Sequence, residues 1–250
     1  MNEAATLIFP IDFGSSMPKG AARKAVDEIG RRIANGVYKP GEIMPTEPEL
    51  ASSLNVSRAT VRDAIKVLSG KGLVRTARRY GTHVRPVEEW NLLDPDVAGW
   101  HEPNHPRFRQ MFAETTELRT IIEPAAAALA AERATEAQVR LILKSAYAIE
   151  PTDGDVVALF EADCLFHATM LDATGNLMMQ QLRPIILSML RISYEYGVMA
   201  PDSEPVTRQG HIEVAEAIRR RDPGAANRAM AAMLDKNRQM AAHFRSPPAS

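Results

Sequence analysis

Two side chains of the kind that bind metal ions lie four residues apart in the second half of the chain. Asp163 and His167 fall on one face of a predicted helix, and His211 lies on a later predicted helix. One carboxylate and two imidazoles suit Zn²⁺ or Mn²⁺. The sequence therefore predicts that Asp163, His167 and His211 share one divalent ion or hydrogen-bond a ligand directly. A satisfied internal Asp–His pair without a ligand is the third possibility.

An arginine interrupts the apolar stripe of the helix expected near residues 107–133. Arg119 shares this stripe with Phe112 and Ile122. Burying a cation is costly unless an anion pairs with it, and a planar guanidinium binds a carboxylate through two parallel hydrogen bonds. We therefore expect Arg119 to bind the carboxylate of a small effector. The alternative is an exposed ion pair with Glu123, four residues later.

Polar groups interrupt three predicted helical stripes in this half of the chain. Asp163 and His167 lie in the stripe of a helix expected near residues 155–173, and His211 shares a stripe with Ile218 near 206–221. Buried ionisable groups are stable only where they meet partners. The effector-binding residues that we expect in one shared pocket are Arg119, Asp163, His167 and His211.

In the first third of the chain, basic residues occupy one side of a short predicted helix. Arg58 and Arg62 lie four residues apart near its N-terminus, whereas Val61, Ile65 and Leu68 form the face that packs into a core. Such a helix fits the major groove of B-DNA, where an arginine can donate two hydrogen bonds to guanine. The alternative is a pair of solvated arginines on an ordinary helix.

Further helix signals and a hairpin signal surround this helix. Residues 21–35 carry an apolar helical stripe, and Thr46-x-x-Glu49 is a capping box that begins a short second helix. Residues 73–85 are two β-prone runs around a basic turn. Three helices followed by a basic hairpin are the order of a winged helix-turn-helix.

The distribution of charge agrees with a polyanionic partner for this part of the chain. Residues 1–86 contain 14 Lys and Arg and 8 Asp and Glu, whereas residues 87–250 contain 16 and 23. An excess of positive charge favours binding to duplex DNA. The residues that we expect to contact DNA are Thr46, Ser57, Arg58, Thr60, Arg62, Lys66, Arg75, Arg78, Arg79 and Gly81.

The pattern along the rest of the chain predicts a mainly α protein. Residues 1–20 have no periodicity and are expected to be a flexible arm. Residues 87–106 are expected to be a linker with a short helical turn near Asp96–Trp100. Helices are expected near 107–133, 135–149, 155–173, 176–198, 206–221 and 223–244. We therefore predict an N-terminal winged helix-turn-helix over residues 21–86 and an all-α antiparallel bundle over 107–245 that binds the effector and forms the dimer.

Cysteine content and hydropathy indicate where such a chain works. The one cysteine, Cys164, excludes a disulfide within the chain and suits a reducing compartment. The first residues lack the basic start of a signal peptide, and no run approaches the ~18 apolar residues of a membrane span. These features predict a cytoplasmic protein without a membrane partner.

The first third of the chain resembles the GntR family of bacterial transcription regulators. The resemblance covers residues 21–86 and rests on MPTEPELASSLNVSRATVRDAIKVLSGKGLV followed by RYGTHV. It implies a homodimer on a short inverted repeat of double-stranded DNA, with Arg58, Arg62 and the Gly81 turn in contact with it.

The second half resembles the ligand-binding (FCD) domain of the subfamily that contains the fatty-acid regulator. Three segments carry this resemblance: Glu117-Leu118-Arg119 with Glu123-Pro124, Asp163 with Phe166-His167, and His211. In many members a third histidine from the last helix completes a metal site. Met233 stands at that position here, and a thioether is a poor ligand for Zn²⁺ or Mn²⁺. The expected metal ligands therefore stay Asp163, His167 and His211.

Within the subfamily, three longer segments resemble regulators of sugar-acid catabolism. They are WNLLDPDVAGW, ELRTIIEPAAAALAAERAT and EADCLFHATMLDATGNLMMQQL. The resemblance implies a repressor, not an enzyme, that a galactonate-like aldonate releases from its operator. Another carboxylate, such as a uronate, a keto-acid or an amino acid, stays open as the effector.

Two other classes of protein compete with this interpretation. A metal-dependent hydrolase would use one aspartate and two histidines to activate water, but it leaves the complete DNA-binding motif unexplained. A nonspecific architectural DNA-binding protein would use the helical half only to dimerise. Such helices have no need for Arg119, Asp163 or His211 in their buried stripes.

Overall fold

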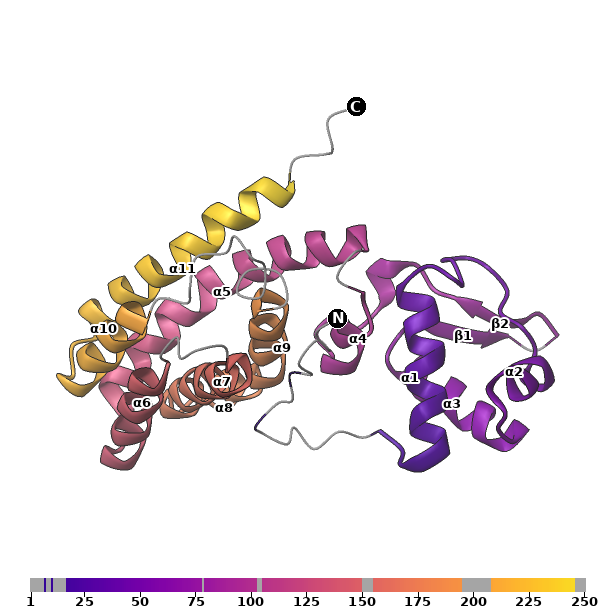
Figure 1. Ribbon diagram of the computed structural model, residues 1–250, viewed down its shortest axis with the longest axis horizontal. Helices are drawn as coiled ribbons and strands as arrows, with labels where there is room; N and C mark the ends of the chain where they lie inside the picture. Colours follow the sequence, from indigo (N-terminus) through magenta and orange to yellow (C-terminus); the bar gives the residue numbers. More distant parts are fainter. Residues whose placement is uncertain are drawn as a thin grey trace. The chain divides into compact units, whose positions relative to one another are not determined.

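The computed structural model describes residues 7, 10, 17–77, 79–102, 105–149, 155–194 and 208–245 (Figure 1). The chain divides into two compact units, one between Gly14 and His105 and another that begins at Pro106 and includes the first residues of the chain. The described residues are mainly helical, with one two-stranded sheet. This agrees with the predicted fold class. No described helix is long and apolar enough to cross a membrane.

The first unit has the predicted order of three helices and a hairpin. Its elements are α1 (Gly20–Ala34), α2 (Glu47–Leu54), α3 (Arg58–Gly70), β1 (Val74–Ala77) and β2 (Gly81–Val84). The apolar stripes of α1 and α3 meet in its core, because these helices pack against each other. Ser57 caps α3, since its hydroxyl accepts a hydrogen bond from the backbone N–H of Thr60 at 3.0 Å.

The hairpin after α3 is antiparallel, with Val74 opposite Val84 and Ala77 opposite Gly81. Arg79 of the turn and Gly81, the first residue of β2, adopt the left-handed backbone region, at φ 73° and φ 82°. Glycine enters this region at little steric cost, which explains a glycine at the end of the turn. The exposed side chains of Arg79 and Tyr80 are thereby carried between two paired strands.

The structure confirms the short helical turn expected near Asp96–Trp100, but the segment around it is folded rather than the linker expected over residues 87–106. A short 3-10 helix (Val87–Glu89) and α4 (Pro95–Gly99) lie in this stretch, and the core of the first unit contains Trp90, Val97 and Trp100. Two tryptophans bring a large apolar surface that is stable only when buried. The sequence did not predict this folded segment, because it contains several prolines and its apolar residues follow no helical or strand period.

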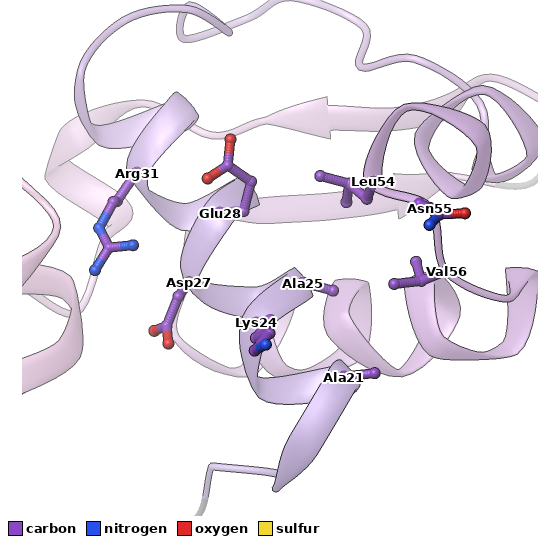
Figure 2. Close-up of a pocket in the computed structure, with 9 residues that line it drawn as sticks. All are labelled: Ala21, Lys24, Ala25, Asp27, Glu28, Arg31, Leu54, Asn55 and Val56. Carbon is purple, nitrogen blue, oxygen red and sulfur yellow. The ribbon is translucent and has the colours of Figure 1, made fainter.

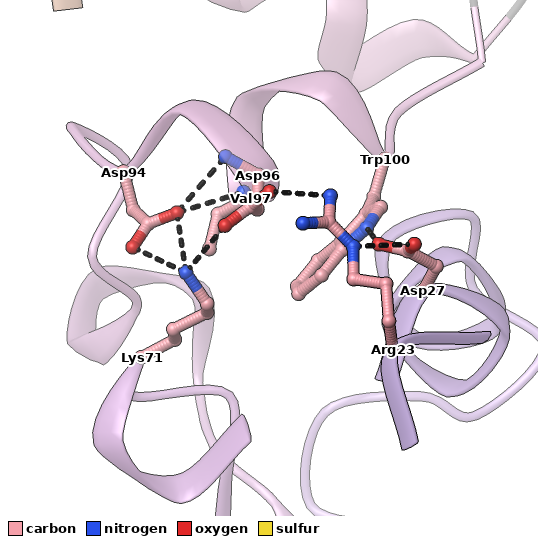
Figure 3. A network of polar contacts seen from close by, with 7 residues as sticks. All are labelled: Arg23, Asp27, Lys71, Asp94, Asp96, Val97 and Trp100. Atoms are coloured by element: carbon pink, nitrogen blue, oxygen red, sulfur yellow. Dashed lines mark hydrogen bonds and ion pairs between the residues drawn. The ribbon is translucent and has the colours of Figure 1, made fainter. Parts of the chain in front are cut away.

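A polar network holds the same segment against α1 (Figure 3). Arg23 of α1 donates hydrogen bonds to Asp27 at 2.7 Å and to Asp96 at 3.0 Å. The indole N–H of Trp100 donates to Asp27 at 3.0 Å. The Trp100 ring occupies the space where a side chain at Gly30 would lie, 2.5 Å from a Cβ built there. Gly30 is therefore what allows the tryptophan to pack on α1.

The second unit is an all-helical bundle (Figure 1). Its helices are α5 (Pro106–Arg133), α6 (Glu136–Ala148), α7 (Val156–Ala173), α8 (Leu177–Gln180), α9 (Arg183–Ser193), α10 (Arg208–Arg219) and α11 (Pro223–Arg245). Helix α11 runs along α5, and both contact α10. Alanines 126, 127, 130 and 131 of α5 are fully buried in the core of the bundle. Their small side chains let neighbouring helices approach closely.

The helix that the sequence predicts over residues 176–198 is two helices. Helix α8 ends at Gln180 and α9 begins at Arg183. Pro184 lies in the first turn of α9, where a residue without a backbone N–H is tolerated. Pro184 lacks the N–H that a continuous helix would direct to the carbonyl of Gln180, the residue at which α8 ends. Residues 195–198 lie outside the described part of the chain.

Residues 7, 10 and 17–20 are the described part of the expected N-terminal arm. Met17 is buried in the core of the first unit, and Gly20 begins α1. Leu7 is buried with Phe160 and Tyr194 of the second unit. The described apolar residues of this segment therefore pack against folded elements. The prediction of a flexible arm otherwise falls outside the described residues.

Candidate DNA-binding and effector-binding sites

Helix α3 presents its basic residues to solvent, as the sequence predicts. Arg58, Arg62 and Lys66 are exposed, whereas Val61 and Ile65 are buried. The two faces follow from the helical period, since residues three and four apart share a face. The helix therefore offers an exposed basic surface on a support that the core fixes.

The other residues expected to contact DNA surround this surface on α2, α3 and the hairpin. Arg75, Arg79 and Gly81 of the hairpin are exposed, and so are the N-cap residues Thr46 and Ser57. The capping interactions of these two residues fix where α2 and α3 begin.

Two of the expected DNA contacts stand apart from this group. Thr60 is half-buried, and its hydroxyl lies 2.8 Å from that of Ser57. It therefore offers DNA less surface than the other residues of α3. Arg78 lies outside the described residues.

An acidic residue that the sequence did not single out contacts Arg62. Glu47 begins α2, and its Oε2 atom lies 2.9 Å from Nη2 of Arg62. Both carboxylate oxygens also lie 3.3 Å from Nε of the arginine. The hydrogen bond from Arg62 lowers the pKa of Glu47. The two residues are 15 positions apart, so only the turn between α2 and α3 brings them together.

In the helical unit, five ionisable residues form what we call the buried polar cluster. Each member is at most 3 % exposed. Helix α5 contributes Arg119 and Glu123, α7 contributes Asp163 and His167, and α10 contributes His211. The structure therefore brings together all four residues that the sequence assigned to one pocket. Glu123 is the addition, and its position four residues after a buried arginine was the signal for it.

The members of the buried polar cluster form a continuous chain of contacts. Nε2 of His211 lies 3.0 Å from Oδ1 of Asp163, and Nε2 of His167 lies 3.2 Å from the same oxygen. Nδ1 of His167 lies 2.9 Å from Oε2 of Glu123. Nε of Arg119 donates to Oε1 of Glu123 at 2.6 Å. Basic and acidic side chains thus alternate from α5 to α10.

These contacts shift the pKa values of the cluster. Burial favours the neutral form of each group, yet Arg119 and His167 lower the pKa of Glu123 to about 2. The two histidines likewise lower the pKa of Asp163 against the effect of burial. Burial alone would lower the pKa of His167, but the carboxylates of Glu123 and Asp163 raise it to about 9. Both carboxylates are therefore ionised at neutral pH.

Arg119 is buried in the expected stripe, but its ion pair with Glu123 is not the exposed one that we considered. The pair is fully enclosed, with Nη2 of the arginine 3.4 Å from Oε2 of the glutamate. Glu123 thus neutralises the buried cation and orients its guanidinium. The geometry makes Arg119 part of the cluster.

The donor atoms of the cluster fit a divalent metal ion. Asp163, His167 and His211 each offer one ligand atom, a carboxylate oxygen or a ring nitrogen, and these three atoms lie within 4.8 Å of one another. Neither ring nitrogen of His167 makes a well-directed hydrogen bond, although both lie close to carboxylate oxygens. A carboxylate on the second nitrogen of a ligating imidazole, as Glu123 is here, is common at metal sites. Met233 is half-buried and packs against the apolar core.

An open pocket of about 510 Å³ lies elsewhere, in the first unit between α1 and the turn after α2 (Figure 2). Basic and acidic side chains both line it, among them Lys24, Glu28 and Arg31. None of the residues predicted to bind an effector borders it. Its volume alone is a weaker argument for a ligand site than the enclosed charges of the buried polar cluster, because open surface grooves need no ligand to be stable.

Comparison with known proteins places both units in one family of regulators. Residues 21–84 match the model of bacterial regulatory proteins of the gntR family, and residues 114–236 match that of the FCD domain. The chain belongs to the GntR family. The gntR match contains all the residues expected to contact DNA, and the FCD match contains the entire buried polar cluster.

Individual members of the family are similar over most of their length. The galactonate operon transcriptional repressor of Escherichia coli is 34% identical over 214 residues, which are 84% of this chain and 92% of that protein. The HTH-type transcriptional repressor NanR of Citrobacter rodentium is 29% identical over 84% of this chain and 80% of that protein.

A solved structure agrees with the fold. It is that of Lar, which controls the expression of the Listeria monocytogenes agr system, and it aligns with a TM-score of 0.56 at 18% identity. The alignment covers 90% of this chain and 98% of that one. GntR-family proteins are transcription regulators that bind DNA, and this chain is one of them.

Proposed function

We propose that this GntR-family regulator represses a sugar-acid catabolic operon and leaves its operator when a small carboxylate binds the helical unit. The observation that carries the proposal is the buried polar cluster. A bundle that served only to dimerise would be more stable with apolar residues at these positions, because buried ion pairs often contribute less than well-packed side chains. The 34% identity to the galactonate operon repressor supports a galactonate-like aldonate as the effector.

The DNA-binding half of the proposal concerns the exposed surface of α3. A homodimer would place two copies of α3 in successive major grooves of an inverted repeat. Arg58 and Arg62 would each donate hydrogen bonds to guanine, while the hairpin arginines would contact the phosphate backbone. Basic residues on both elements support this arrangement.

The second part of the proposal concerns the effector, and it gives the two ends of the buried polar cluster separate roles. Arg119 would bind the effector carboxylate while Glu123 keeps its guanidinium in place. Two nitrogens of the Arg119 guanidinium contact Glu123, and this contact fixes the plane of the group. Asp163, His167 and His211 would contact the hydroxyl groups of the sugar acid. An aldonate offers one carboxylate and a chain of hydroxyls, which matches this division.

A divalent ion, if bound, would be held by Asp163, His167 and His211, with Met233 outside its coordination shell. Such an ion would supply a concentrated positive charge that binds oxygen atoms of the effector. Three protein ligands leave coordination positions for other groups, as in metal sites that bind small molecules. Glu123 would orient His167 from its other ring nitrogen.

Calorimetry with purified protein tests the effector assignment. We expect D-galactonate or a related aldonate to bind the wild-type chain and to raise its melting temperature, because a ligand of the native state stabilises it. Uronates, keto-acids and amino acids form the comparison panel. Arg119→Ala should abolish this binding while DNA binding is retained. If Arg119→Ala binds the same effector as tightly as the wild type does, the assignment of Arg119 is wrong.

The same experiment separates a regulator from a hydrolase. A regulator releases DNA when the metabolite binds, and the metabolite is recovered unchanged. Chromatography of the ligand after incubation therefore accompanies the titration. Conversion of the ligand to a new product would contradict the assignment as a regulator.

A further inference from the structure

A carboxylate lies among the basic residues expected to contact DNA. Glu47 is close enough to Arg62, Arg58 and Lys66 that all three lower its pKa. A negative charge at such a surface repels phosphates and weakens binding to any duplex. Its position at the start of α2, next to the exposed face of α3, therefore needs a reason other than affinity for DNA.

The geometry of the pair indicates what the carboxylate does. Glu47 accepts from the Nε side of the Arg62 guanidinium, through Nε and Nη2. The arginine side chain is otherwise 62% exposed, whereas that of Glu47 is 33% exposed and anchored on another helix. A bidentate contact of this kind fixes the plane of the guanidinium as well as its position. The edge of the guanidinium away from Glu47, which carries Nη1, is the edge that would donate hydrogen bonds to a guanine.

We infer that Glu47 is a positioning residue that orients Arg62 for a guanine and so sets the sequence preference of DNA binding rather than its overall strength. The inference rests on the proposed contact between Arg62 and DNA. An oriented arginine loses less conformational freedom when it binds a base. The paired carboxylate also offsets the attraction of Arg62 to phosphates at sites without the guanine.

Removing the carboxylate should therefore move two affinities in opposite directions. Glu47→Gln should weaken binding to the preferred site and strengthen binding to unrelated duplex. A bidentate base contact discriminates by roughly 5- to 150-fold. We expect Glu47→Gln to reduce the preference by about fivefold or more. Asp63→Asn is the matched control, because Asp63 is a carboxylate of α3 that pairs with Lys66 at 3.1 Å.

The test uses the full-length protein and a duplex that the wild type selects from a random-sequence pool. Affinities for this duplex, for a shuffled duplex of equal length and for variants with each G·C pair replaced are measured at one salt concentration. The proteins are wild type, Glu47→Gln, Asp63→Asn, Arg62→Ala and the double variant Glu47→Gln/Arg62→Ala. Thermal unfolding of each verifies that it is folded.

If Glu47 acts through Arg62, Glu47→Gln and Arg62→Ala relax the preference for the same G·C pair. The double variant then shows the same preference as Arg62→Ala alone. Asp63→Asn keeps the wild-type preference. A loss of preference in Arg62→Ala with none in Glu47→Gln overturns this inference and leaves the proposed contact standing. An unchanged preference in Arg62→Ala overturns both. Equal effects of Glu47→Gln and Asp63→Asn would show that only net charge matters.

Discussion

The ammonium group of Lys71, the residue that follows α3, lies between the two carboxylate oxygens of Asp94, at 2.6 and 2.8 Å (Figure 3). Asp96 contacts the same nitrogen at 2.8 Å. Lys71 is only 7% exposed, so this cation is almost completely removed from water. The segment that leads out of the DNA-binding unit is thus joined to the end of α3 by charge as well as by its tryptophans.

Removing the Lys71 cation should destabilise the DNA-binding unit. Lys71→Met leaves two partly buried aspartates facing each other, and losing one partner of a buried ion pair costs about 3 kcal/mol or more. Because these carboxylates keep some contact with solvent, we expect a smaller destabilisation than for a fully buried pair, about 2–3 kcal/mol. Urea unfolding followed by tryptophan fluorescence measures it, since both tryptophans of the chain lie in this unit.

Lys66→Met is the control for this variant. Lys66 is exposed and pairs with exposed Asp63, so its loss should change the free energy of unfolding by less than about 1 kcal/mol. Equal destabilisation by the two variants would show that the buried ion pairs of Lys71 stabilise the fold no more than the exposed ion pair of Lys66 does.

Gly30 and Gly70 should respond in opposite directions to the same substitution. Gly30→Ala places a methyl group 2.5 Å from the Trp100 ring and should cost about 1–3 kcal/mol through overpacking. Gly70→Ala meets nothing within 4 Å at the end of α3 and should be neutral or stabilise by up to about 1 kcal/mol. Unfolding of both variants, followed by tryptophan fluorescence, measures the two changes in stability. A Gly30→Ala variant more stable than the wild type would contradict the close packing of Trp100 on α1.

The sequence predicted the first unit well because its elements carry local signals. The capping box at Thr46, the cap at Ser57 and the stripe of Val61, Ile65 and Leu68 are each readable within a few residues. The folded segment after the hairpin had no such period. Trp100 packs on Gly30 of α1 and Trp90 is buried in the same core, and such tertiary contacts leave no local pattern.

The buried polar cluster was partly predictable for the same reason. Asp163, His167 and Arg119 interrupt helical stripes, so their burial follows from the period of the helices. The burial of the Arg119–Glu123 pair did not follow, because a spacing of four residues also occurs in exposed ion pairs. The contact between Glu47 and Arg62 depends on the angle between two helices and was beyond any pattern in the sequence.

Metal content should depend on the cluster. If the site holds an ion, purified wild type contains one divalent ion per chain and His167→Ala contains little or none, because imidazole is a principal ligand. Met233→Leu should keep the wild-type content, since thioether sulfur is a poor ligand for Zn²⁺ or Mn²⁺. Elemental analysis of the three proteins measures this. The same metal content in His167→Ala as in the wild type would place the ion elsewhere.

Arg62 should contribute to the recognition of a specific DNA site. Arg62→Ala should weaken binding to the selected duplex by about 1–3 kcal/mol if the arginine contacts a guanine. Arg31→Ala removes the same charge from α1, at a residue outside the set expected to contact DNA, and should have a much smaller effect. Fluorescence anisotropy at several salt concentrations measures both. Indistinguishable losses in the two variants would argue against α3 as the helix that enters the groove.

The most direct test of the account is release of operator DNA by effector in wild type and Arg119→Lys. Lysine keeps the positive charge beside Glu123 but cannot reproduce the planar guanidinium. We expect both proteins to bind the selected duplex equally well, because the DNA-contacting residues lie in the other unit. Fluorescence anisotropy of the labelled duplex follows its release. An aldonate concentration that releases the duplex from the wild type should fail to release it from Arg119→Lys. Release of both proteins at equal effector concentration would contradict the claim that Arg119 of the buried polar cluster binds the effector carboxylate.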